Sequence, residues 1–523
     1  MSVLPAWLRH YARPTFAGDL TAGLIVTALL IPQSLAYALL AGLPPQAGLY
    51  ASILPLLAYA ALGSSMTLAV GPVAVISLMT AEALAPMAAP GSPAHAALAA
   101  QLALLSGVLL AGLALLRLGF VARFLSQPVV QGFITGSALL IAWGQARLIL
   151  GAGWPSAMLG IGTIAFLALA RRWVPGLPGK LAPIAALVAA TGFVAAFSPE
   201  GVRVVGEVPG GLPAFQFPLP DAPALEALWM PALLISLVGF VESVSVARSL
   251  RQGERIEANR ELAGLGAANL ASACSGGFPV TGGFARSVVN AQAGARTPMA
   301  GVIAAGLMAV VLAGFTGLFR HLPHAVLAAT IIVAVASLLD PRGFLETWRY
   351  DRGDGLAYAA TAAGVLALGV ERGVLAGVIL SLGLVVWRGS RPHIAVVGRI
   401  PGTEHFRNVD RHAVETRAGL LALRIDESLF FGNASAVEDA VERRLAEAPG
   451  TGRVLLVLSA VNHVDASGLA MLDELDTRLA QRGIVLQFAE VKGPVMDRLR
   501  GTPLGGRLSG RVFLTAQQAF AAG

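Results

Sequence analysis

The chain has 523 residues, of which 56% are hydrophobic and only 13% are charged, and its mean hydropathy is +0.71. Soluble domains carry about 25% charged residues, so this composition excludes a soluble multidomain protein and indicates an integral membrane protein. The net charge of +7 does not indicate nucleic-acid binding, because the basic residues mostly flank apolar runs. The single cysteine, Cys274, excludes an intramolecular disulfide.

The first apolar run follows a mixed N-terminal stretch. Residues 1–19, MSVLPAWLRHYARPTFAGD, lack the pattern of a cleavable signal peptide, and we expect them to stay attached on the cytoplasmic surface. The run LTAGLIVTALLIPQSLAYALLAG, residues 20–42, is long enough to cross a hydrocarbon core of about 30 Å. Similar runs continue to about residue 391.

These runs predict fourteen membrane spans in two sets of seven, separated by a polar connection at residues 198–228. The first set is 18–40, 48–62, 72–85, 97–116, 127–150, 157–170 and 181–197. The second set is 229–247, 261–273, 284–293, 298–319, 323–339, 355–368 and 373–387. We expect both ends of the chain in the cytoplasm, since this topology leaves only four flanking basic residues outside, Arg147, Arg203, Arg320 and Arg372.

The third span of each set is unusual. Residues 64–79, SSMTLAVGPVAVISLM, and 276–290, GGFPVTGGFARSVVN, each have a Gly/Pro break before a short run that favours a helix. Because each set has an odd number of spans, the two sets run through the membrane in opposite directions and these segments are equivalent. Matching interrupted spans of this kind predict a binding site near the membrane midplane.

Such a site favours an anion. Backbone at a helix interruption cannot face lipid, because each unpaired N–H or C=O group costs several kcal/mol. We therefore expect both interruptions to line a buried cavity. Two helix N-termini would meet there, each with about half a positive charge. Arg286 begins the tenth span, where an arginine costs about 2.5–3.5 kcal/mol. Either it adds its charge to this site, or it snorkels to a membrane interface.

The residues around these two segments resemble a known family. IPQSLAYALLAGLPPQAGLYASILPLLAYAALGSSMTLAVGPVAVISLM, with GGFPVTGGFARSVVNAQAGARTPMAG, is similar to the sulfate permease family, which is solute carrier family 26 in animals. The resemblance implies an α-helical polytopic membrane protein with a transport domain at residues 1–391. Its two inverted repeats of seven spans, about 14–197 and 229–391, would form the core and gate domains of the uracil-permease fold, and the members are usually homodimers.

The resemblance also assigns a substrate pocket. Its expected residues come from the first, third and tenth spans, with two more shaping the approach: Gln33, Tyr37, Val73, Ala285 and Arg286, then Gly71 and Pro72. Two positions depart from the family pattern. Leu39 stands where some relatives have an acid, which weakens a coupling role for the first span, and Ala285 stands where animal relatives often have serine.

Glu242 is the candidate for coupling transport to an ion gradient. It lies in the eighth span, in LISLVGFVESVSVARSL at residues 234–250, and an acid at this place resembles the group that carries proton or sodium coupling in relatives. Burial favours its neutral form, whereas a nearby Arg286 opposes this. The alternative is an ordinary carboxylate near the cytoplasmic end of a helix.

Beyond residue 391, strands alternate with amphipathic helices, which predicts a small α/β domain at residues 394–523. The run VLSAVNHVDASGLAMLDEL resembles the signature of the STAS domain, which is cytoplasmic in the family. The serine that is phosphorylated in anti-sigma-factor antagonists corresponds to Ser467, a candidate regulatory residue. Helix capping by Asp465 and Ser467 is the simpler interpretation.

Taken with the resemblance, these residues predict a secondary active transporter of small oxyanions such as sulfate, bicarbonate or dicarboxylates like fumarate. We expect alternating access, proton-coupled symport, and a homodimer in the bacterial inner membrane. Anion exchange, or an anion channel of the same architecture, is the alternative. No arrangement of nucleophile, base and acid indicates an enzyme, and we expect no cofactor, no metal and no nucleic-acid partner.

Overall fold

The computed structural model describes residues 7–8, 11, 13–120, 126–174, 177–250 and 254–522. Residues 1–6, 9–10 and 12 of the predicted N-terminal lead-in lie outside the described residues. The chain forms two compact units, Met1–Ser381 and Leu382–Gly523. The first is helical, and the second is an α/β unit.

The helices of the first unit follow the predicted spans closely. Those of the first repeat are α1 (Arg13–Leu40), α2 (Pro45–Tyr50), α3 (Leu54–Leu62), α4 (Ala74–Leu84), α5 (Pro93–Leu115), α6 (Gln127–Gly151), α7 (Trp154–Trp173) and α8 (Leu177–Phe197). Those of the second are α9 (Ala222–Leu250), α10 (Ala258–Cys274), α11 (Phe284–Gln292), α12 (Met299–Gly314), α13 (His324–Ala336), α14 (Pro341–Tyr350), α15 (Arg352–Leu368) and α16 (Val370–Gly389). A 3-10 turn, Thr316–Phe319, follows α12.

Each of the fourteen predicted spans overlaps at least one of these helices. In the described part of the chain, eight helical segments are long and apolar enough to cross a membrane. The span count of fourteen therefore stays a prediction. Helix α14 was not predicted, because its sequence PRGFLETWRY has no apolar run and none of its residues is buried.

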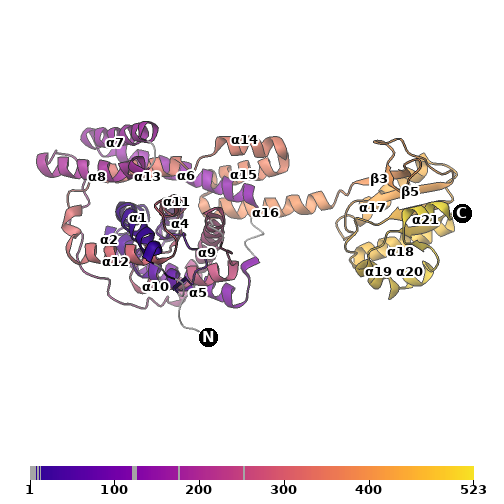
Figure 1. Ribbon diagram of the computed structural model, residues 1–523, viewed down its shortest axis with the longest axis horizontal. Coiled ribbons are helices and arrows are strands. Elements are labelled where there is room, and N and C mark those ends of the chain that lie inside the picture. Colours follow the sequence, from indigo (N-terminus) through magenta and orange to yellow (C-terminus); the bar gives the residue numbers. More distant parts are fainter. Residues whose placement is uncertain are drawn as a thin grey trace. The chain divides into compact units, whose positions relative to one another are not determined.

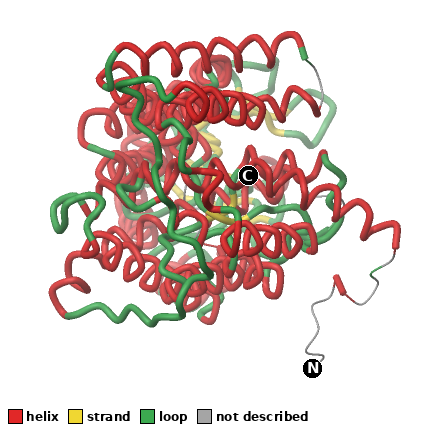
Figure 2. The backbone as a smooth tube through the Cα atoms, turned by 90° about the vertical axis from the view of Figure 1, so that its left-hand side faces the viewer, coloured by secondary structure: helices red, strands yellow, loops and turns green. Residues whose placement is uncertain are grey.

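The helices of the first unit form two groups (Figures 1 and 2). Helices α1–α5 pack with α9–α12 around α1, α4 and α11, whereas α6–α8 pack with α13–α15 in the band at the top of Figure 1. Small residues allow close packing within a group. A Cβ atom on Gly107 of α5 would lie 2.7 Å from the backbone nitrogen of Leu270 on α10, so only glycine fits there.

Two short strands lie at the centre of the first group. Strands β1 (Val70–Gly71) and β2 (Thr281–Gly282) pair antiparallel, with Val70 opposite Gly282 and Gly71 opposite Thr281. All four residues are buried. Each strand leads directly into a short helix, α4 or α11, which is the interrupted-span structure expected from the Gly/Pro breaks. Pairing the strands satisfies backbone groups that have no helical partner.

Helix α10 holds the approach to both strands. The buried carboxylate of Glu261 accepts hydrogen bonds from Tyr59 Oη at 2.8 Å, from Ser64 N at 2.8 Å and Oγ at 2.6 Å, and from Ser65 N at 3.1 Å. The Asn269 side chain exchanges two 2.9 Å hydrogen bonds with the backbone N–H and C=O of Val280. These side chains fix the segments that enter β1 and β2, respectively.

The second unit contains a six-stranded sheet in the order β4-β3-β5-β6-β7-β8. Its strands are β3 (Ile394–Arg399), β4 (Phe406–Asn408), β5 (Leu420–Ile425), β6 (Arg453–Val457), β7 (Val485–Ala489) and β8 (Val512–Phe513). Its helices are α17 (Ala434–Glu447), α18 (Ala466–Gln481), α19 (Gly493–Arg500), α20 (Pro503–Arg507) and α21 (Ala516–Ala521). Strand β3 pairs antiparallel with β4 and β5, whereas β5 to β8 are parallel. The sequence prediction of a small α/β domain is confirmed.

We predict that Asn269→Ala lowers the free energy of unfolding by about 2 kcal/mol, because it leaves the buried N–H and C=O groups of Val280 unpaired. Detergent-induced unfolding of the purified protein measures the change. Gln292→Ala is the matched control, since Gln292 is an exposed residue at the end of α11. Equal stability of the two variants would show that α10 does not hold β2.

Candidate functional site

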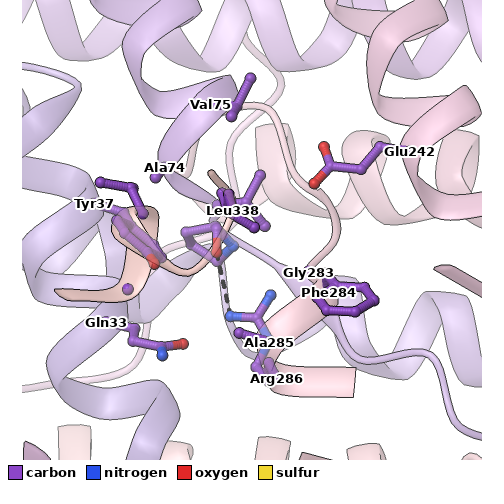
Figure 3. Close-up of a pocket in the computed structure, with 14 residues that line it drawn as sticks. Gln33, Tyr37, Ala74, Val75, Glu242, Gly283, Phe284, Ala285, Arg286 and Leu338 are labelled. Atoms are coloured by element: carbon purple, nitrogen blue, oxygen red, sulfur yellow. Dashed lines mark hydrogen bonds between the residues drawn. The ribbon is translucent and has the colours of Figure 1, made fainter. Parts of the chain in front are cut away.

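A small cavity of about 50 Å³ lies where β1 and β2 lead into α4 and α11 (Figure 3). It is lined from both helix groups, since α13 contributes to its wall together with α1, α4, α9 and α11. The lining residues are Gln33, Tyr37, Pro72, Val73, Ala74, Val75, Glu242, Gly283, Phe284, Ala285, Arg286, Ala334, Val335 and Leu338.

The N-termini of α4 and α11 both open on this cavity. Val73 and Gly283 are the N-cap residues, and neither end has a side chain that accepts from its free N–H groups. The first residues of the two helices, Ala74, Val75, Phe284 and Ala285, line the cavity. Two uncapped helix N-termini concentrate positive potential there, which favours an anion.

Arg286 adds a full charge beside these helix ends. Its side chain is 3% exposed. It donates to the Ala69 carbonyl from Nε at 3.4 Å and from Nη2 at 3.3 Å, and to the Pro72 carbonyl from Nη1 at 3.2 Å. Three of its five N–H groups are thus used, and two remain for a ligand. Among the described residues, no carboxylate lies within 4.0 Å of its nitrogens.

The position of Arg286 rules out the snorkelling interpretation, because a guanidinium at a membrane interface would be solvated. The structure instead places it between the two repeats, where it joins α11 to the segment around β1. A Cβ atom on Gly71 would lie 3.2 Å from Nη2 of Arg286, so the small residue lets the guanidinium approach the strand. Gly71 itself does not line the cavity.

Gln33 and Tyr37 form the opposite wall. They are one turn apart on α1 and therefore point the same way, and Pro32 precedes them inside the helix. Tyr37 is 8% exposed. Neither side chain hydrogen-bonds to another described residue, so the amide and the phenol are free to contact a ligand.

Glu242 reaches the cavity from the middle of α9, on the side away from Gln33 (Figure 3). Its atom Oε2 is buried and has no hydrogen-bond partner among the described residues. An unpaired buried carboxylate oxygen is unfavourable, and protonation or an incoming group would relieve the cost. Glu242 lies eight residues before the end of α9 at Leu250, so the helix-end interpretation does not fit its position.

The structure thus brings together seven residues singled out from the sequence, namely Gln33, Tyr37, Pro72, Val73, Glu242, Ala285 and Arg286. The sequence did not indicate Ala334 and Val335 of α13, or Leu338 in the turn after it. These apolar residues carry no chemical signal, and only the packing of α13 against α1 brings them to the cavity.

Ser467 lies in the second unit, in the first turn of α18, where it is exposed. The cap of this helix is Asp465, whose side chain accepts from Gly468 N at 2.8 Å. Hydrogen bonds from the backbone N–H groups of Gly468 and then Phe431 lower the pKa of Asp465. The capping role expected for Asp465 is therefore observed, whereas Ser467 is not the cap. The regulatory role of Ser467 stays a prediction.

Two protein-family models match this chain. The Sulfate permease family model matches residues 16–156 and 151–361. The chain belongs to the sulfate permease family. A STAS domain model matches residues 411–519. Since a permease moves solutes and converts none of them, membership in this family agrees with the prediction that the protein is not an enzyme.

Relatives within the family align along almost the whole chain. A probable sulfate transporter of Mycobacterium tuberculosis is 39% identical and covers 98% of this chain and 96% of its own. A chloroplastic sulfate transporter of Arabidopsis thaliana is 36% identical and covers 92% of this chain and 76% of its own.

Solved structures agree with the fold. The murine Solute Carrier 26 family member A9 anion transporter, in the inward-facing state, has a TM-score of 0.89 at 22% identity and covers 99% of this chain and 93% of its own. The transmembrane domain of a cyanobacterium bicarbonate transporter has a TM-score of 0.60 at 25% identity. The match covers 71% of this chain and 99% of that domain. The chain therefore has a helical, membrane-spanning fold of the solute carrier 26 type with a C-terminal STAS domain.

If the cavity binds an oxyanion such as sulfate, we predict that Gly71→Ala weakens this binding about tenfold, because the new Cβ displaces the Arg286 guanidinium and misaligns at least one charge-assisted hydrogen bond. Sulfate-dependent thermal stabilisation of the purified protein reports the affinity. Gly144→Ala on α6 is the control, since a Cβ there meets no atom within 4 Å. Unchanged affinity in Gly71→Ala would mean that the position of the guanidinium does not matter.

Proposed function

We propose that this protein is a secondary active transporter of small oxyanions that works by alternating access. The observation that carries this proposal is the buried Arg286 guanidinium beside the uncapped N-termini of α4 and α11, in a cavity of about 50 Å³. Partial charges of the helix ends and a full charge together suit an anion with several oxygens. Sulfate, bicarbonate and the carboxylates of fumarate all meet this requirement.

The similar proteins support this substrate class. The Mycobacterium tuberculosis and Arabidopsis thaliana relatives are named as sulfate transporters, and one similar structure is that of a bicarbonate transporter. Sulfate is the first candidate, since the relatives with the higher identity carry that name. The binding roles that we propose are direct contact for Gln33, Tyr37 and Arg286, with Val73 and Ala285 presenting helix N–H groups.

The construction of the cavity supports the proposal of alternating access. Residues of α1, α4, α9 and α11 belong to one helix group, whereas Ala334 and Val335 belong to α13 of the other, and Leu338 lies in the turn that follows α13. Relative movement of the two groups would separate the α13 wall from the anion-binding side. We propose residues 1–391 as the transport domain and residues 394–523 as a cytoplasmic STAS domain, in a homodimer of the bacterial inner membrane.

We further propose that transport is proton-coupled through Glu242. Glu242 lines the same cavity as Arg286, and its Oε2 has no partner among the described residues. A proton on Glu242 would reduce the net charge that crosses with the anion. The alternatives are exchange of one anion for another, which needs no titrating group, and an anion channel.

Arg286→Ala tests the binding role. We predict that uptake of labelled sulfate into liposomes falls about 30-fold or more, because the variant loses the full positive charge that Arg286 presents to the cavity. Arg296→Ala serves as the control, since Arg296 is an exposed arginine ten residues further along the chain. Gel filtration of both variants checks folding, which matters because Arg286 also joins the two repeats. Uptake at the wild-type rate by folded Arg286→Ala would refute the role.

Glu242→Gln tests the coupling. We predict that an inward proton gradient accelerates uptake by the wild type and that the variant loses this acceleration while it still binds sulfate, because glutamine keeps the shape but cannot titrate. Uptake with and without the gradient gives the comparison. Acceleration retained in the variant excludes Glu242 as the coupling group. A wild type that ignores the gradient but responds to internal anion is an exchanger.

A further inference from the structure

The second unit carries a basic pocket of about 480 Å³ at one end of its sheet. Its lining residues come from the start of β3, from β4 and the turn after it, and from the end of β5: His393, Arg407, Asn408, Arg411, His412, Arg424 and Asp426. Three arginines and two histidines thus share one hollow with a single acid. Its volume is typical of small-molecule binding sites.

The single acid stabilises the pocket and does not oppose an anion. Asp426 accepts from Arg424 Nε at 2.5 Å and Nη2 at 2.9 Å, and its Oδ2 lies 2.8 Å from His393 Nδ1. Both carboxylate oxygens are therefore occupied. The hydrogen bonds from Arg424, and then that from His393, lower the pKa of Asp426, so the carboxylate stays ionised and holds both neighbours in place.

The remaining cations have unused donors. The side chains of Arg411 and His412 make no hydrogen bond or ion pair with any other described residue, and Arg407 donates only to the Phe406 carbonyl, at 3.0 Å. All three are exposed. The guanidinium groups of Arg407 and Arg411 therefore have N–H groups free to donate. Guanidinium groups match the several oxygens of a phosphate better than a monatomic anion.

The pocket begins only a few residues after a segment that can span a membrane. Helix α16 is among the segments long and apolar enough to span a membrane, and it ends at Gly389, four residues before His393. Four residues extend over at most about 14 Å. Near the helix end, Arg391 stacks on Trp387 at 3.9 Å from the ring centroid, a pair of residue types that favours the headgroup region.

The pairing of β3 with β4 and β5 places the other lining residues at the same end of the sheet as His393. Strand β4 pairs antiparallel with β3, and the Val409 N–H donates to the Val396 carbonyl at 3.1 Å, so the chain after β4 returns toward the start of β3. Ile394 at that start lies opposite Ile425 of β5. Arg411, His412 and Arg424 are therefore held near His393, at the end of the sheet that follows α16.

We propose that the basic pocket binds a phosphate group, supplied either by an anionic lipid headgroup of the adjacent membrane surface or by phosphate from solution. A lipid source matches the short link to α16, because basic clusters immediately beside a span attract anionic headgroups. Occupancy would tie the start of β3 to the membrane near the end of α16. This site is separate from the cavity around Arg286 and does not depend on the proposed transport function.

Hydrogen exchange of the full chain in nanodiscs tests the proposal. Exchange at residues 406–412 is compared in phosphatidylcholine nanodiscs, in nanodiscs with added phosphatidylglycerol, and in phosphatidylcholine nanodiscs with inorganic phosphate, all at one ionic strength. Slower exchange with phosphatidylglycerol alone supports the lipid source, and slower exchange with inorganic phosphate supports the soluble one. No change with either probe overturns the proposal.

The double variant Arg407→Gln, Arg411→Gln provides the specific control. We expect the half-saturating amount of the active probe to rise about 30-fold, since each arginine near an anionic headgroup contributes about fivefold. Arg443→Gln is the matched variant, because Arg443 is an exposed arginine of α17 outside the pocket. Unchanged protection of β5 and β6 shows that the double variant is folded. The same response in the double variant as in wild type overturns the proposal.

Discussion

Unpaired backbone groups inside a membrane are the constraint on which this structure depends. The segments before α4 and α11 are not helical, and each N–H or C=O group left unpaired there would cost several kcal/mol. The antiparallel pairing of β1 with β2 satisfies part of this requirement. Side chains pair with further backbone groups. Ser243 Oγ accepts from Gly282 N at 2.9 Å, and Ser287 Oγ accepts from Ala69 N at 2.9 Å.

The pairing that satisfies these backbone groups also shapes the cavity that we propose as the anion site. Because β1 and β2 are held side by side, α4 and α11 begin close together and present their free N–H groups to one cavity. Arg286 then donates from the second repeat to the backbone of the first, and Asn290 does the same through its 2.9 Å hydrogen bond to the Thr67 carbonyl. The charge that favours an anion is thus part of the framework that joins the repeats. A residue that both lines the cavity and joins the repeats is costly to replace.

Local sequence patterns predicted the parts of this arrangement that depend on local chemistry. Gly/Pro breaks indicated the interrupted third spans, and an arginine within an apolar stretch indicated a charged site. The residues that hold the breaks were not predicted. Glu261 and Asn269 appear in the sequence as ordinary polar residues of an apolar helix, and their roles depend on contacts with Ser64 and Val280 that only the fold brings about. The same applies to the apolar α13 wall and to α14, whose exposed residues leave no apolar run.

The position of a bound oxyanion tests the central claim most directly. Selenate is a sulfate analogue whose selenium gives an anomalous signal, so diffraction from crystals grown with selenate locates it without assumptions about the site. The account predicts one anomalous peak in the cavity, with selenate oxygens about 3 Å from the Arg286 guanidinium and from N–H groups at the starts of α4 and α11. A peak elsewhere in the first unit, or an empty cavity in protein that transports selenate, would contradict it.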